Sequence, residues 1–137
     1  MSELSVAQLG KAIGRLEESL EAYRAEPENL MYRDSVIKRF EFTFEVVQSL
    51  LRRFVTAYSV NVKQREQLTF PTLIRTASQD GVLRGGYDVW HGFRDARNRT
   101  SHAYNEDQAV AVVEAVPGFL DEVRFLYMRL GEEMADV

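Results

Sequence analysis

The chain has 137 residues, no cysteine and a net charge of -4, with 45% hydrophobic and 28% charged residues. This composition predicts a single soluble globular domain over residues 1–137. The lack of cysteine excludes a disulfide framework. No apolar run approaches the ~20 residues that a membrane span requires, so a membrane span is excluded as well. The acidic balance argues against a protein that coats duplex nucleic acid, and a start without a secretory signal predicts a cytoplasmic location.

An apolar stripe with alternating spacings of four and three residues marks the first predicted helix. Such a spacing places the apolar side chains on one face of an α-helix. The stripe stops before the polar segment 26–29, where Pro27 removes a backbone N–H donor and restricts the residue before it. The residues of the stripe are Leu9, Ile13, Leu16, Leu20 and Tyr23.

The second predicted helix carries a longer stripe and is the predicted centre of the core. Its apolar residues alternate three and four positions over six steps. Two basic pairs, at 38–39 and 52–53, lie off this stripe and are interpreted as a solvated flank. The stripe consists of Ile37, Phe40, Phe44, Val47, Leu51, Phe54 and Tyr58.

A short helix and then a fourth helix are predicted after a polar, irregular segment at residues 59–68. Thr69 has the side chain of an N-cap, and Pro71 fits the first helical turn, where its missing N–H is not needed. Gly81 predicts the end of the short helix, because glycine is common just beyond helix C-termini. Gly85 and Gly86 predict a turn before a helix that begins at Tyr87. The apolar side of the short helix consists of Leu73, Ile74 and Ala77.

The last predicted helix begins at Asn105, with Gln108 three residues later, as in a capping box. Two acidic residues between them suit the positive N-terminal end of a helix. Pro117 lies inside the apolar stripe and predicts a kink or a break. The stripe consists of Val113, Val116, Leu120, Val123, Tyr127, Leu130 and Met134.

These segments together predict an all-α fold. Short loops between long helices favour neighbours that run in opposite directions. We therefore predict an antiparallel up-and-down four-helix bundle with one short extra helix, and strands have almost no support in the sequence.

The segment from Arg97 to Tyr104 carries the residues that suggest chemistry. Arginine is a permanent cation that fits phosphate, histidine titrates near neutral pH, and a tyrosine hydroxyl can be modified or can donate a hydrogen bond. This combination points toward phosphodiesters or nucleotides.

The spacing within this segment limits what one helix can do. Asn98 and His102 are four positions apart and would share a face of an ideal helix. Arg97 and His102 are five positions apart, about 140° around the helix axis. A groove, a helix end or a second subunit would have to bring these two together. The alternative interpretation is that both are exposed residues in the last turn, where cations interact favourably with the helix dipole.

Three separated segments, at residues 36–45 (VIKRFEFTFE), 94–98 (RDARN) and 101–106 (SHAYNE), occur in one order along the chain. With the further segment 116–120, this pattern resembles the nucleotidyltransferase substrate-binding proteins, which belong to the HEPN superfamily together with the HepT-type toxins. The similarity extends from about residue 9 to residue 130 and covers nearly the whole chain.

The resemblance implies that the protein forms a homodimer. It also implies a partner protein, a minimal nucleotidyltransferase whose gene lies beside the gene of this chain. The superfamily motif, Arg-x4-6-His, maps onto Arg97 and His102, with Asn98 as the polar residue after the arginine. The HepT form of the motif adds a tyrosine two residues after the histidine, which is Tyr104. The chain departs from none of these positions.

In catalytic members of the superfamily, the two motifs of a dimer meet in a cleft and cleave RNA without a metal ion. The resemblance implies that His102 is the acid or base at the ribose 2'-hydroxyl and that Arg97 stabilises the phosphorane charge. Asn98 could orient the histidine ring by hydrogen bonding. By resemblance to HepT, Tyr104 is the hydroxyl that the partner adenylylates to silence the toxin.

Other side chains near the motif have alternative interpretations. Trp90 and Phe93 could stack on bases, but large aromatic residues favour the core or the dimer interface. Asp95 with Glu41 or Glu45 has ligand chemistry, but the spacing matches no known carboxylate metal site. We therefore predict no metal ion and no cofactor.

Two functions remain in competition for the same dimer and the same partner. One is a HepT-like toxin component of a toxin-antitoxin pair, a metal-independent endoribonuclease. The other is a purely non-catalytic accessory or scaffold subunit that helps to present a substrate to the nucleotidyltransferase. The intact motif favours chemistry, while the acidic balance leaves the binding of an RNA or nucleotide substrate unexplained. The sequence leaves both alternatives open.

Overall fold

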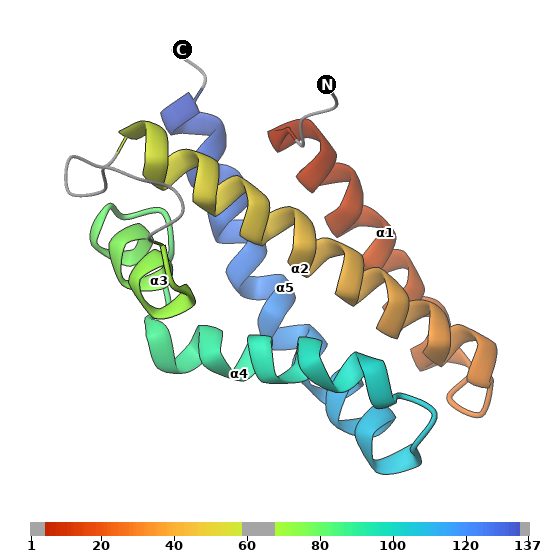
Figure 1. The fold of residues 1–137 in the computed structure, drawn as a ribbon. Helices are drawn as coiled ribbons and strands as arrows, with labels where there is room; N and C mark the ends of the chain where they lie inside the picture. The colour runs from red at the N-terminus through yellow and green to blue at the C-terminus, as the bar shows by residue number, and fades with distance from the viewer. Residues whose placement is uncertain (1–4, 59–67, 135–137) are drawn as a thin grey trace.

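The computed structural model describes residues 5–58 and 68–134, and these residues form helices without any strand (Figure 1). The prediction of an all-helical fold is therefore confirmed. Most of the polar segment expected at residues 59–68 lies outside the described residues. None of the described helices is both long enough and apolar enough to cross a bilayer. The elements are α1 (Val6–Ala25), α2 (Leu30–Tyr58), α3 (Phe70–Gln79), α4 (Tyr87–Arg99), the 3-10 helix η2 (Thr100–His102) and α5 (Glu106–Met134).

The long helices α1, α2 and α5 pack along one another, and α4 lies across one end of this group (Figure 1). The first helix runs antiparallel to α2, and α4 runs antiparallel to α5 (Figure 1). The short helix α3 packs against both α2 and α4. This arrangement brings the end of α4 and the 3-10 helix η2 beside the N-terminal half of α2.

The helix boundaries follow from local capping and turn residues. Ser5 caps α1 through a reciprocal capping box with Gln8. Thr69 accepts a hydrogen bond from the backbone N–H of Thr72 at 3.3 Å, which confirms the predicted start of α3. Gly81 has a φ of 83°, a left-handed conformation that glycine adopts without steric cost, and it follows the end of α3 as predicted.

The apolar stripes identify the core correctly in α1 and in α2 up to Phe54, but Tyr58 at the end of the α2 stripe is 39% exposed, and the α5 stripe is correct only in part. Tyr127 belongs to the predicted stripe of α5 and is nevertheless 41% exposed. Its ring lies over α1 at Gly10, where an added Cβ atom would approach the ring to 2.9 Å. The predicted stripe also lacks four fully buried residues of this helix, namely Ala109, Val112, Phe119 and Leu126. Pro117 was predicted to cause a kink or a break. Helix α5 continues through it, so there is no break.

The predicted capping box at the start of α5 is only half formed. Asn105 accepts a hydrogen bond from the backbone N–H of Gln108 at 3.2 Å, as expected of an N-cap. The side chain of Gln108 does not return to the N-cap but accepts a hydrogen bond from Arg99 Nη1 at 2.8 Å. The reciprocal bond is therefore replaced by a link between the end of α4 and the start of α5.

Phe119 is the centre of an aromatic cluster that fixes α4 on the rest of the bundle. Its ring centroid lies 4.8 Å from that of Phe40 and 6.3 Å from that of Phe44, both on α2. The rings of Phe93 and Trp90 on α4 lie 5.3 Å and 6.2 Å away, both edge to face. Trp90 and Phe93 are buried, so of the two expected locations, the core or the dimer interface, they occupy the core, and they do not form a base-stacking surface.

Removing the central ring should therefore destabilise the fold. We expect Phe119→Ala to lower the free energy of unfolding by about 3–5 kcal/mol, because it leaves a cavity among four aromatic rings. Phe42→Ala is the matched control, since this side chain is 56% exposed, and we expect a change of at most about 0.5 kcal/mol. Urea unfolding followed by circular dichroism measures both values, and equal losses in the two variants would contradict this view of the core.

Candidate functional site

Arg97 lies in the last turn of α4, where its guanidinium group faces two carboxylates of α2. Its Nε and Nη2 atoms both donate to Oε1 of Glu45, at 2.9 Å and 2.5 Å. Its Nη1 atom lies 3.5 Å from Oε2 of Glu41. The two glutamates are one helical turn apart on α2, so they meet the guanidinium group from neighbouring positions. Arg97 is therefore held by tertiary contacts over a sequence separation of about fifty residues.

Glu41 is the most connected carboxylate of this site. Its Oε2 atom is 3.1 Å from the hydroxyl of Thr100, and its Oε1 atom accepts a hydrogen bond from Nζ of Lys38 at 3.0 Å. The hydroxyl of Thr100 is also 2.7 Å from the backbone carbonyl of Arg97 and 3.4 Å from Arg97 Nη1. A hydroxyl has one proton, so Thr100 donates to either acceptor at a given moment and can accept from Arg97.

The surroundings of Glu41 keep its carboxyl group ionised. Partial burial by itself would raise the pKa of Glu41, but hydrogen bonds from Lys38 and Thr100 and the charges of Lys38 and Arg97 outweigh it. The net result is a pKa below the ordinary value of 4.5. At neutral pH, Glu41 is therefore a fixed negative charge that orients the cations around it.

The structure separates Asn98 and His102 from this network. Helix α4 ends at Arg99, and the 3-10 helix η2 follows it. The predicted shared face of Asn98 and His102 requires one α-helix through both residues, and α4 does not extend to His102. Both side chains are exposed, and neither forms a hydrogen bond or an ion pair with any residue in the described ranges. His102 instead lies near Tyr104, with ring centroids 6.3 Å apart and the ring planes at 71°.

Two neighbouring hollows run along α2 beside this network. The larger, of about 500 Å³, lies between α2 and the segment that follows α4, and Tyr104 is at its edge with 88% of its surface exposed. The smaller, of about 340 Å³, lies over Arg97 and shares Lys38 and Glu41 with the larger one. The structure thus brings Arg97 and Tyr104 to one surface of α2. The larger hollow is lined by Asp34, Ile37, Lys38, Glu41, Thr100, Ala103 and Tyr104, and the smaller by Lys38, Glu41, Phe42, Glu45 and Arg97.

Sequence reasoning missed the roles of the α2 residues at this site. Glu41 and Glu45 were considered only as metal ligands together with Asp95, but Asp95 pairs with Arg99 at 3.3 Å and the two glutamates face Arg97. Lys38 is exposed, as predicted for a solvated flank, yet it also lines both hollows. The available signal was that an i, i+4 pair of acidic residues lies beside the apolar stripe of α2.

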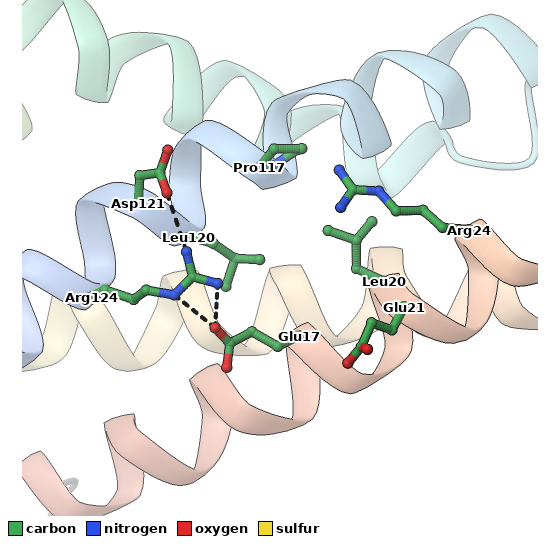
Figure 2. Close-up of a pocket in the computed structure, with 8 residues that line it drawn as sticks. All are labelled: Glu17, Leu20, Glu21, Arg24, Pro117, Leu120, Asp121 and Arg124. Carbon is green, nitrogen blue, oxygen red and sulfur yellow. Dashed lines mark hydrogen bonds and ion pairs between the residues drawn. The ribbon is translucent and has the colours of Figure 1, made fainter.

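A further hollow, of about 480 Å³, lies between α1 and α5 and contains none of the motif residues (Figure 2). Arg124 of α5 points across it to Glu17 of α1 and also pairs with Asp121 at 3.2 Å (Figure 2). The cation therefore links the two helices that border the hollow. We therefore interpret these ion pairs as structural contacts between α1 and α5.

Comparisons with known proteins give one consistent result. A family model described as nucleotidyltransferase substrate binding protein like matches residues 4–132. The protein named probable ribonuclease HepT of Haemophilus influenzae is 32% identical over 94 residues, which are 69% of this chain and 64% of that protein. A solved structure from the same organism, described as the fold of a substrate binding domain of a nucleotidyltransferase, superimposes with a TM-score of 0.83 at 26% identity. That superposition covers 92% of this chain and 98% of the other.

The lowered pKa of Glu41 predicts a pH-dependent contribution to stability. A carboxyl group whose pKa is lower in the folded state stabilises the fold fully above its unfolded value, here 4.5, and this contribution is lost as the pH falls through the lower folded value. We expect Glu41→Gln to reduce the Tm most at neutral pH, and the gap to wild type to narrow in acid.

Thermal unfolding at a series of pH values tests this expectation. Glu21→Gln is the matched control, because Glu21 is exposed on α1 and does not line either hollow of α2. This control should leave the Tm near the wild-type value at each pH. A gap between Glu41→Gln and wild type that stays constant from neutral pH into acid would contradict the network.

Proposed function

Because the chain belongs to the nucleotidyltransferase substrate binding protein-like family, we propose that it is the partner subunit of a minimal nucleotidyltransferase and a HepT-like member of the HEPN superfamily. In this proposal α1, α2, α4 and α5 are the four principal helices of a bundle that works as a homodimer. The dimer binds RNA or a nucleotide and acts on it at a cleft between the two motifs. The observation that carries the proposal is the position of Arg97 at a surface hollow, with Tyr104 at the edge of the adjoining one.

Arg97 has the properties of a phosphate-binding group. A guanidinium group is planar, always charged and able to form two parallel hydrogen bonds to phosphate oxygens. Its side chain is partly buried and is held at Nη1 by Glu41, so little conformational freedom is lost when a phosphate binds. A held arginine can stabilise the negative charge that develops on a phosphorane.

A second copy of the chain would supply what one copy lacks. Neither His102 nor Asn98 lines the smaller hollow over Arg97 or the larger one beside it, so these hollows of one chain do not gather the motif around one phosphate. Both side chains are exposed and available to a neighbouring subunit. A homodimer cleft in which Arg97 of one chain meets His102 of the other would complete the site.

The proposed reaction is transesterification within the RNA backbone. The ribose 2'-oxygen attacks the adjacent phosphorus while one His102 imidazole takes its proton, and the 5'-oxygen leaves with a proton from an imidazolium group. The products are an RNA end with a 2',3'-cyclic phosphate and an RNA end with a 5'-hydroxyl group. Arg97 stabilises the phosphorane, and Asn98 is proposed to orient the imidazole ring of His102. The named relative, a probable ribonuclease, supports this chemistry, although the alignment spans only 64% of its length.

Tyr104 is the proposed point of control. Its phenol group is almost fully exposed, so a nucleotidyltransferase could reach it, and Lys38 lines the same hollow with a positive charge suited to phosphate. In the proposed modification the phenolic oxygen attacks the α-phosphorus of ATP, a bond to the AMP group forms, and pyrophosphate leaves with the phenolic proton going to a base. The added nucleotide would lie close to His102 and exclude RNA.

A purely non-catalytic accessory role is the second candidate. Glu41 and Glu45 balance the charge of Arg97, and the chain has a net charge of -4, so the ion pairs and the net charge do not favour electrostatic attraction of RNA to this site. In this role the hollows of α2 would hold a nucleotide or a segment of the partner without cleavage. The two candidates share one dimer and one partner and differ in whether Arg97 and His102 perform chemistry.

RNA cleavage in the presence of EDTA separates the two candidates. We expect the purified protein to cleave RNA, and Arg97→Ala and His102→Ala to be at least about 100-fold slower, because each removes a group that acts in the transition state. Arg124→Ala is the charge-matched control, since this arginine lies in the hollow between α1 and α5, and it should cleave at the wild-type rate. Absence of cleavage, or equal cleavage by all proteins, would favour the accessory subunit.

Modification of Tyr104 has its own test. After co-expression with the neighbouring nucleotidyltransferase, we expect mass spectrometry of tryptic peptides to find AMP on Tyr104 and not on Tyr127, a second exposed tyrosine. Tyr104→Phe should remain unmodified and should cleave RNA with or without the partner. An unmodified Tyr104, or equal labelling of Tyr127, would argue against a control point at this residue.

A further inference from the structure

The edge of Arg97 that suits a phosphate best is already occupied in the free chain. The Nε–H and one Nη2–H of a guanidinium group point in the same direction and form the edge that binds carboxylates and phosphates through two parallel bonds. In this structure both atoms donate to a single oxygen, Oε1 of Glu45, at 2.9 Å and 2.5 Å. A phosphate group can therefore bind to this edge only if the carboxylate of Glu45 leaves it.

The two glutamates around Arg97 differ in how firmly they are held. Glu41 is 24% exposed at its side chain, and both of its oxygens are engaged, one by Lys38 and one by Thr100 and Arg97. Glu45 is 53% exposed, and within the described part of the chain Arg97 is its only hydrogen-bond or ion-pair partner. Rotation of Glu45 into solvent breaks contacts with one residue only, whereas rotation of Glu41 would disrupt contacts with three residues.

The space around the pair is sufficient for an exchange of anions. Glu45 and Arg97 both line the smaller hollow of about 340 Å³, which is open at the surface of α2. Nη1 of Arg97 faces Glu41 and Thr100, on the side of the guanidinium group that Glu45 does not use. The guanidinium group can therefore remain in position while the anion on its Nε and Nη2 edge changes.

We propose that Glu45 is a displaceable counter-anion: it occupies the phosphate-binding edge of Arg97 in the free chain, and a phosphate of RNA or of a nucleotide takes its place. Glu41 and Thr100 hold the guanidinium group during this exchange and act as positioning residues. The inference rests on the proposed function in one respect, namely that a phosphate group binds at Arg97.

If this exchange occurs, removing the charge of Glu45 and removing the charge of Glu41 should change the affinity for phosphate in opposite directions. Loss of the Glu45 charge removes the competitor and should strengthen the binding of phosphate. Loss of the Glu41 charge releases the guanidinium group from its position and should weaken binding, although it also removes a negative charge. A general electrostatic effect would instead strengthen binding in both variants, so the sign of the change at Glu41 is diagnostic.

The experiment measures binding of a fluorescent 2'-O-methyl RNA hexamer, which has no 2'-hydroxyl group and cannot be cleaved, by fluorescence anisotropy. We expect Glu45→Gln to bind about fivefold more tightly than wild type, the fold-change that matches the upper range for exposed ion pairs. Glu41→Gln and Thr100→Val should bind more weakly than wild type while remaining folded by circular dichroism. Glu21→Gln, which removes one remote charge, should bind as wild type does.

The double variant Arg97→Ala with Glu45→Gln decides whether the gain acts through Arg97. We expect it to bind no more tightly than Arg97→Ala alone, because the freed edge no longer exists. A gain that persists in the double variant, a gain in Glu41→Gln equal to that in Glu45→Gln, or no gain in Glu45→Gln would each overturn the proposal.

A second readout separates this inference from the proposed function. If no variant binds RNA, the proposed function fails, and the exchange is then tested with inorganic phosphate alone. The Nε–H resonance of Arg97 in 15N NMR should shift on addition of phosphate, and it should reach half its shift at a lower phosphate concentration in Glu45→Gln than in wild type. A resonance that does not respond to phosphate in either protein would overturn the exchange itself.

Discussion

The edge-to-face packing around Phe119 is the interaction on which the position of the site depends. This ring on α5 joins α2, through Phe40, to α4, through Phe93 and Trp90. Aromatic rings in this geometry have a restricted set of low-energy orientations, so they fix the angle and the register of the helices that carry them. The end of α4 is thereby placed beside α2, and the guanidinium group of Arg97 reaches two carboxylates that are remote in sequence.

The charges around Arg97 turn this packed junction into a candidate site. Glu41 and Glu45 pair with the arginine in the free chain, and these ion pairs link the end of α4 to α2. Binding of RNA or a nucleotide would then depend on local exchange at one guanidinium edge rather than on net charge, which is -4. An acidic chain can therefore bind a phosphate, provided that the phosphate replaces an anion already present.

The fold could be predicted from the sequence to the extent that it depends on local patterns. The stripe of α1, the stripe of α2 as far as Phe54, the N-cap at Thr69 and the glycine after α3 are short-range signals, and the structure confirms them. The exposure of Tyr127 and the contact of Gln108 with Arg99 depend on neighbouring helices, so periodicity could not reveal them.

The site was predicted less completely than the fold. The motif indicated Arg97 and Tyr104 as site residues. The two partners of Arg97, Glu41 and Glu45, lie about fifty residues away in sequence and contact Arg97 only through tertiary packing. The change to a 3-10 helix at Thr100 also altered the relation of His102 to Asn98.

A crystal structure of the chain with a 2'-O-methyl RNA bound would show whether a phosphate replaces Glu45 at Arg97. We expect a phosphate on the Nε and Nη2 edge of Arg97, with Glu45 turned away, Glu41 unmoved and His102 of a second copy near the same phosphate. An Arg97 still paired with Glu45, with RNA bound elsewhere on the molecule, would contradict this expectation.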